Sequence, residues 1–175
     1  MDSKYPPFVI TPMILKLVAD IQEMLGEIKS LTLKKPPLRL RKENKIKTIH
    51  YSLAIEGNVL TEDQVTEILE NKKVVGPKKQ ILEVKNALSL YEEIGKLRPQ
   101  NEKDFLHAHK VLMQDLVARP GLYRSGAVGI FKNDKISKMA PPAKLVPKLM
   151  GDLFSFLKND QMTHALLKAC IFHYE

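Results

Sequence analysis

The feature that most constrains this fold is a helical spacing of apolar residues that recurs along the chain. It is clearest just after Thr11 and Pro12, a pair typical of a helix start. Apolar residues then follow at intervals of three and four, as expected for one face of a helix. This stripe comprises Ile14, Leu17, Val18, Ile21, Leu25 and Ile28.

The same spacing predicts further helices. One covers residues 40–57, and a short one begins at a capping box of Thr61 and Gln64. Others are expected over residues 81–94, after Asn101, and from near residues 147 and 163. Paired prolines exclude a helix around residues 31–39. We therefore predict an N-terminal helix and proline-containing linker over residues 1–39, followed by one mainly helical domain over residues 40–175.

A single strand signal interrupts the helices. Residues 128–131 and 136–139 have strand character and are joined by residues 132–135. The predicted fold class is therefore all-α, with one two-stranded β-hairpin at about residues 127–139.

Composition is consistent with one globular unit inside a cell. The 175 residues are 44% hydrophobic, which suffices for one core. No apolar run reaches the length of a membrane span, and the first seven residues lack the blocks of a secretory signal. Cys170 is the only cysteine, which excludes an intrachain disulfide and favours a cytoplasmic location. Because it lies on an apolar helix face, we expect Cys170 in the core.

The formal net charge of +8 is concentrated in one segment. No aromatic residues are interleaved for base stacking, so a solvated basic face is favoured over a nucleic-acid surface. The basic residues of this segment are Lys34, Lys35, Arg39, Arg41, Lys42, Lys45 and Lys47.

The histidine pair His107 and His109 does not predict a metal site. Residues two apart on a helix point away from each other, and we expect one of the two rings to bond inside the protein. No metal ligand is therefore assigned.

Glu56 is the most informative single residue. The stop residue Gly57 places its carboxylate in the last turn of the predicted helix. The helix dipole makes that place mildly unfavourable for an anion. Such an acid is either a solvated surface residue or one held for a cation elsewhere.

Four segments, in order, resemble the Fic (Fic/Doc) family of protein adenylyltransferases. Residues 52–58, Ser-Leu-Ala-Ile-Glu-Gly-Asn, are similar to the inhibitory motif (Ser/Thr)-x-x-x-Glu-(Gly/Asn). Residues 120–130 are similar to Pro-Gly-x-(Phe/Tyr)-Arg-x-x-x-Val-x-Ile, which begins the substrate flap of the family. Residues 139–142 with residues 145–153 form a third match to the family, and residues 166–175 are similar to the helix that leads into its catalytic loop. The resemblance covers roughly residue 40 to the end.

The catalytic motif of the family does not occur in these residues. That motif, His-Pro-Phe-x-(Asp/Glu)-Gly-Asn-Gly-Arg-x-x-Arg, is expected about two helical turns after His173. The chain is therefore expected to stop just before it and to be inactive as given. Whether the chain is an enzyme is left open.

For a complete protein, the resemblance implies transfer of AMP from Mg-ATP to a Ser, Thr or Tyr hydroxyl of a target protein. It implies an inhibitory role for Glu56, with Ser52 and Gly57 as part of the inhibitory motif. In that role Glu56 competes with the γ-phosphate of ATP for an arginine of the catalytic motif. It places Ile130, Phe131, Lys132 and Asn133 in the flap beside ATP, with the target docked on the flap edge as an added strand. Association of the chain with a second copy of itself is also left open.

Two other interpretations remain open. In the first, the chain is a natural, non-catalytic Fic-like binding or scaffold protein. In the second, which belongs to a different class, it is a basic helical nucleic-acid-binding protein. The sequence does not identify the modified target.

Overall fold

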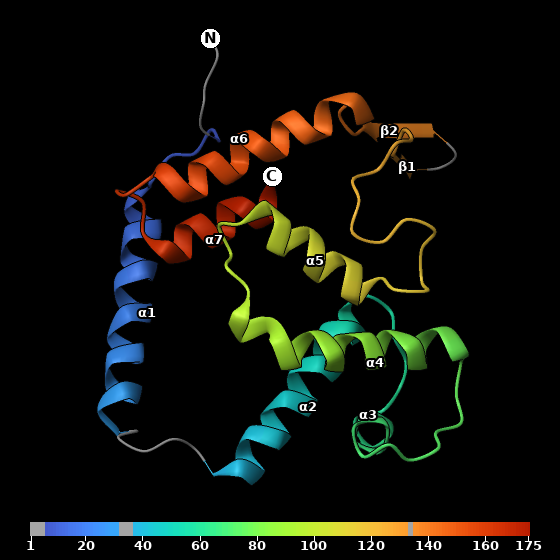
Figure 1. The fold of residues 1–175 in the computed structure, drawn as a ribbon. Helices are drawn as coiled ribbons and strands as arrows, with labels where there is room; N and C mark the ends of the chain where they lie inside the picture. The colour runs from blue at the N-terminus through green and yellow to red at the C-terminus, as the bar shows by residue number, and fades with distance from the viewer. Residues whose placement is uncertain (1–5, 32–36, 133–134) are drawn as a thin grey trace. The chain divides into compact units, whose positions relative to one another are not determined.

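The computed structural model describes residues 6–31, 37–132 and 135–175. Figure 1 shows the order of its elements along the chain. The chain divides into two compact units, and each is described by itself. Unit 1 comprises Met1–Leu31 with Tyr123–Glu175, and unit 2 comprises Thr32–Leu122. The predicted division near residue 39 stays a prediction.

Unit 2 is a group of four α-helices packed through one apolar core. Its elements are α2 (Leu38–Ile55), α3 (Glu62–Leu69), α4 (Lys78–Glu93), the short 3-10 helix η1 (Ile94–Lys96) and α5 (Glu102–Leu112). Ile49 of α2 is 1% exposed and Val84 of α4 is fully buried, whereas Ile55 at the end of α2 is 84% exposed. Helix α2 thus buries one face only. The buried core residues are Ile46, Ile49, Leu60, Val65, Ile68, Val84, Ala87 and Leu88.

The helix starts in unit 2 follow local sequence rules. The Thr61 hydroxyl accepts a hydrogen bond from the Gln64 N–H, and the Gln64 side chain accepts one from the Thr61 N–H. This confirms the predicted capping box. Asn101 caps α5, as predicted, by accepting from the main-chain N–H groups of Lys103 and Asp104.

Unit 1 contains three α-helices and a pair of strands. Its elements are α1 (Pro12–Leu31), β1 (Gly129–Lys132), β2 (Lys135–Met139), the 3-10 helix η2 (Ala143–Leu145), α6 (Val146–Asn159) and α7 (Ala165–Tyr174). Phe156 of α6 is fully buried, and its ring centroid lies 6.1 Å from that of Phe8. Phe154 of α6 meets Phe172 of α7 edge to face at 5.3 Å. These aromatic contacts join α6 to α7 and to the segment before α1.

The all-α class is confirmed, but the hairpin predicted with it is wrong in its bounds. The predicted strands, residues 128–131 and 136–139, left a connection of four residues. In the structure β1 and β2 are antiparallel, and Lys132 and Lys135, both predicted to lie in the connection, pair with each other. Only positions 133 and 134 lie between the strands, outside the described residues.

The hairpin is also less regular than predicted. Ile130 pairs with Lys138, but the next residue, Phe131, pairs with Ile136. Ser137 is therefore an extra residue, as in a β-bulge. Alternation along each strand gives no sign of such a register shift. The irregular ribbon is the only sheet within the described residues, which otherwise form an all-α fold.

Two expectations about apolar burial are also corrected. Along α1, Ile14, Val18 and Ile21 are half-buried, whereas Leu17, Leu25 and Ile28 are exposed. Cys170, expected in the core, is exposed and lines a shallow apolar pocket with residues of α7 and the segment before α1. An apolar stripe predicts a buried face only where a neighbour covers it, and periodicity does not show which positions are covered.

Three of the seven residues of the basic segment, Arg39, Lys42 and Lys45, pair with carboxylates. Arg39 pairs with Glu43 at 2.8 Å, and Lys45 pairs with Glu92 at 3.7 Å. Lys34 and Lys35 lie outside the described residues.

Glu70 is the meeting point of two lysines. Its carboxylate contacts Lys42 of α2 at 2.7 Å and Lys72 at 2.8 Å. Hydrogen bonds from Lys42 and then Lys72, together with their charges, lower the pKa of Glu70 from 4.5 to about 2. This ion triad links α2 to the end of α3.

No helix in the described part of the chain combines the length and apolarity needed to cross a membrane.

We predict that Glu70→Gln lowers the free energy of unfolding in a pH-dependent way. Because the folded state lowers the pKa of Glu70, its contribution is present above about pH 4.5 and is lost as pH falls toward 2. Urea unfolding of parent and variant between pH 7 and pH 2 measures the difference. Glu67→Gln, one turn earlier in α3, is the control. A parent–variant difference that stays constant down to pH 2 would contradict the assignment.

Candidate functional site

Glu56 lies directly after α2, as the residue that caps its C-terminal end. It is exposed, and its carboxylate pairs with none of the residues that the structure describes. The last turn of α2 contains no basic residue. The carboxylate therefore stands near the negative end of the helix dipole without a local cation. It can accept a cation that approaches from outside.

The end of α2 has the geometry of a Schellman motif. The Gly57 N–H donates to the Ala54 carbonyl and the Asn58 N–H donates to the Leu53 carbonyl, both at 3.0 Å. Gly57 has φ +89°, the left-handed conformation that glycine adopts most readily. The predicted stop residue is thus confirmed, and it fixes the main chain next to Glu56.

Ser52 lies one turn before Glu56, on the same helix face. Its side chain is exposed and forms no hydrogen bond with the described residues. The hydrogen bonds that fix this helix end come instead from Gly57 and Asn58.

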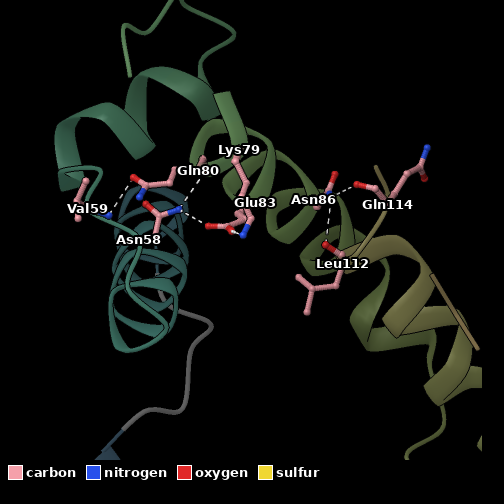
Figure 2. Close-up of polar contacts among 8 residues, drawn as sticks. All are labelled: Asn58, Val59, Lys79, Gln80, Glu83, Asn86, Leu112 and Gln114. Atoms are coloured by element: carbon pink, nitrogen blue, oxygen red, sulfur yellow. Dashed lines mark hydrogen bonds and ion pairs between the residues drawn. The ribbon is translucent and has the colours of Figure 1, made fainter. Parts of the chain in front are cut away.

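Asn58 is the residue of this site whose role sequence reasoning missed. It is 8% exposed, and its side-chain N–H₂ donates to the Gln80 carbonyl at 3.1 Å and to the Glu83 carboxylate at 2.9 Å. Figure 2 shows the Asn58 amide group between these two residues of α4. The Gln80 side chain in turn accepts from the Val59 N–H at 3.2 Å. We call Asn58 with Gln80 and Glu83 the Asn58 clamp.

The local part of this arrangement has a sequence signal. The Asn58 side-chain oxygen accepts from the Leu60 N–H at 3.1 Å, two residues further on, which is an Asx-turn. A glycine-asparagine pair after a helix is typical of such turns. The contacts with α4 have no local signal, because Gln80 is 22 residues away.

A second fixed turn lies where the flap resemblance begins, at Gly121. The Gly121 N–H donates to the His109 ring at 2.8 Å, which confirms that one of the two histidines bonds inside the protein. The other, His107, lies 3.1 Å from Glu93. Gly121 has φ +78°, and a Cβ there would lie 2.8 Å from the Lys110 Cβ. The position therefore requires glycine.

Arg124 closes the base of the strand pair. Its guanidinium donates to the Gly126 carbonyl at 2.9 Å, before β1, and also to the Pro141 carbonyl, after β2. The Ala140 N–H donates to the Val128 carbonyl at 2.9 Å and completes this closure. Arg124 was part of the flap resemblance, and its contacts suggest that it holds the two ends of this segment together.

The predicted flap residues are only partly described. Ile130, Phe131 and Lys132 belong to the main chain of β1. Asn133 lies outside the described residues.

The described residues offer no group of three or more His, Cys, Asp or Glu side chains that could hold a metal ion. The candidate site consists instead of two turns that are fixed by hydrogen bonds. The turn at Gly57 presents the exposed Glu56 carboxylate, and the turn at Gly121 begins the segment that contains the strands.

The fold and these turns define a mainly helical domain in which a glycine-terminated helix presents an exposed carboxylate. The chain is similar to a Fic family protein of known crystal structure from Desulfovibrio desulfuricans G20, with 47% sequence identity and a TM-score of 0.84 over 97% of this chain. By this similarity the chain belongs to the Fic family and has a Fic-like fold. It spans about half, 52%, of the length of that protein. No family model and no curated protein matches the chain.

We predict that Gly121→Ala destabilises the protein by about 1–3 kcal/mol, because a side chain in left-handed backbone is strained and the added Cβ meets Lys110. Urea unfolding measures the loss. Gly126→Ala is the matched control, since a Cβ there meets nothing within 4 Å, and its effect is expected within about 0.5 kcal/mol. Equal effects of the two substitutions would contradict a special role for Gly121.

Proposed function

We propose that this chain is the regulatory and flap-bearing part of a Fic protein that transfers AMP from ATP to a Ser, Thr or Tyr hydroxyl of a target protein, and that Glu56 inhibits that transfer. The observation that carries the proposal is the exposed Glu56 carboxylate at the fixed end of α2, which pairs with no described residue.

The electrostatics at this helix end support an inhibitory role. An anion beside the C-terminal end of a helix is stabilised when a cation approaches it. An arginine would form a charge-assisted, bidentate pair with the carboxylate. The motif that defines the catalytic loop of the family contains such arginines. Glu56 would withhold one of them from ATP, so that inhibition is competition for a single guanidinium.

The residues present do not by themselves fit Mg-ATP. The string His-Pro-Phe-x-(Asp/Glu)-Gly-Asn-Gly-Arg does not occur among the 175 residues, and no candidate metal cluster lies in the described ranges. We therefore propose that these residues alone do not transfer AMP.

A target protein is the proposed partner, docked beside residues 129–139. The chain itself would be located in the cytoplasm, where its only cysteine, Cys170, stays reduced. A nucleic-acid partner is less favoured, because Arg39, Lys42 and Lys45 already pair with carboxylates.

We predict that Glu56→Gly raises autoadenylylation by at least about tenfold in this chain extended through a Fic catalytic motif, which corresponds to about 1.4 kcal/mol of relieved competition. Labelled AMP transferred from ATP measures the rate. Glu56→Asp is expected to give a smaller gain, because it keeps the charge on a shorter side chain.

The control is Glu56→Gln, which removes the charge and keeps the size, and it is expected to activate nearly as well as Glu56→Gly. Thermal unfolding verifies that the variants fold. Folded Glu56→Gly protein that binds ATP but is no faster than its parent would show that Glu56 is only a surface acid.

A further inference from the structure

The side chains of the last turn of α2 add little to the main-chain hydrogen bonds that terminate the helix. Helix ends fray, and an anion such as Glu56 is unfavourable in the last turn. Neither Ser52 nor a basic residue stabilises this turn within the described part of the chain. Something else must hold Glu56 in one place if its carboxylate is to meet a defined arginine.

The Asn58 clamp supplies that restraint. Only Gly57 separates Asn58 from Glu56, and Gly57 is itself fixed by its hydrogen bond to Ala54. The Asn58 side-chain N–H₂ donates two hydrogen bonds to α4, and the side-chain oxygen accepts one from the Leu60 N–H. Asn58 is buried, so loss of these contacts would leave its side-chain amide without partners. Moving the turn away from α4 therefore costs free energy.

The same helix, α4, provides a matched comparison. Asn86 is 9% exposed, and its side-chain N–H₂ donates to the Leu112 carbonyl at 3.1 Å and to the Gln114 carbonyl at 2.8 Å (Figure 2). It resembles Asn58 in burial and in the number of donor bonds. It holds the end of α5, however, and not the turn that bears Glu56.

We infer that Asn58 is a positioning residue for inhibition: through Gln80 and Glu83 it holds the end of α2 on α4, so that Glu56 is presented in the geometry in which it withholds an arginine. This inference rests on the proposed function. It adds that inhibition depends on the clamp as well as on the charge of Glu56. A change that opens the clamp would release inhibition with Glu56 still present.

The test measures autoadenylylation in the same extended protein. Asn58→Ala is expected to raise the rate by at least about threefold, less than Glu56→Gly does. The double variant is expected to match Glu56→Gly, because a carboxylate that is absent needs no positioning. Asn86→Ala should cost similar stability yet leave the gain from Glu56→Gly unchanged. That difference separates positioning from loss of stability, which urea unfolding of each variant records.

Two further variants guard against misfolding. Asn58→Asp keeps the size and the Asx-turn but cannot donate to Gln80 and faces Glu83 with a like charge, so it should activate as Asn58→Ala does. Glu83→Gln keeps an acceptor for Asn58 and should preserve inhibition.

The outcomes separate the two proposals. If Glu56→Gly activates but folded Asn58→Ala and Asn58→Asp do not, the positioning role is overturned and the inhibitory role of Glu56 stands. If the effects of Asn58→Ala and Glu56→Gly multiply, Asn58 acts on something other than Glu56 and the inference is again overturned. If Glu56→Gly itself has no effect, the proposed function fails and the inference fails with it.

Discussion

The hydrogen bonds of the buried Asn58 side chain are the constraint on which the rest of the site depends. They join a turn to a helix 22 to 25 residues further along the chain. Apart from them, the polar contacts that hold this turn are its main-chain bonds and the hydrogen bond from the Val59 N–H to Gln80. With them, Glu56 has a fixed main chain and a carboxylate that pairs with none of the described residues. That combination suits a side chain that must meet a partner from outside in one orientation.

Helix α4 supports both the core and the turns of unit 2. Its apolar side contributes Val84, Ala87 and Leu88 to the core, so its position is set by burial. Its polar residues then hold the end of α2 through Asn58 and the end of α5 through Asn86. The ends of two helices are thus anchored to one helix. The glycine turn at Gly121 is in turn bound to His109 of α5.

Features governed by neighbours in sequence could be predicted, and features governed by distant contacts could not. The capping box at Thr61 and the stop at Gly57 are local, and both are present. The Asn58 clamp, the bulge at Ser137 and the exposure of Cys170 depend on packing that no periodicity encodes. Glu56 was found from its position and from the family motif. Its support by Asn58 was missed because Gln80 and Glu83 look like ordinary surface residues of a helix.

Amide hydrogen exchange of this chain tests the central claim most directly. The N–H groups of Gly57, Asn58, Val59 and Leu60 all donate hydrogen bonds in the turn. The account predicts that they are protected in the parent chain. It also predicts that Asn58→Ala speeds their exchange by at least about tenfold while the amides in the middle of α4 stay protected. Asn86→Ala should leave them unchanged. Rapid, unprotected exchange of these four amides in the parent chain would contradict the account.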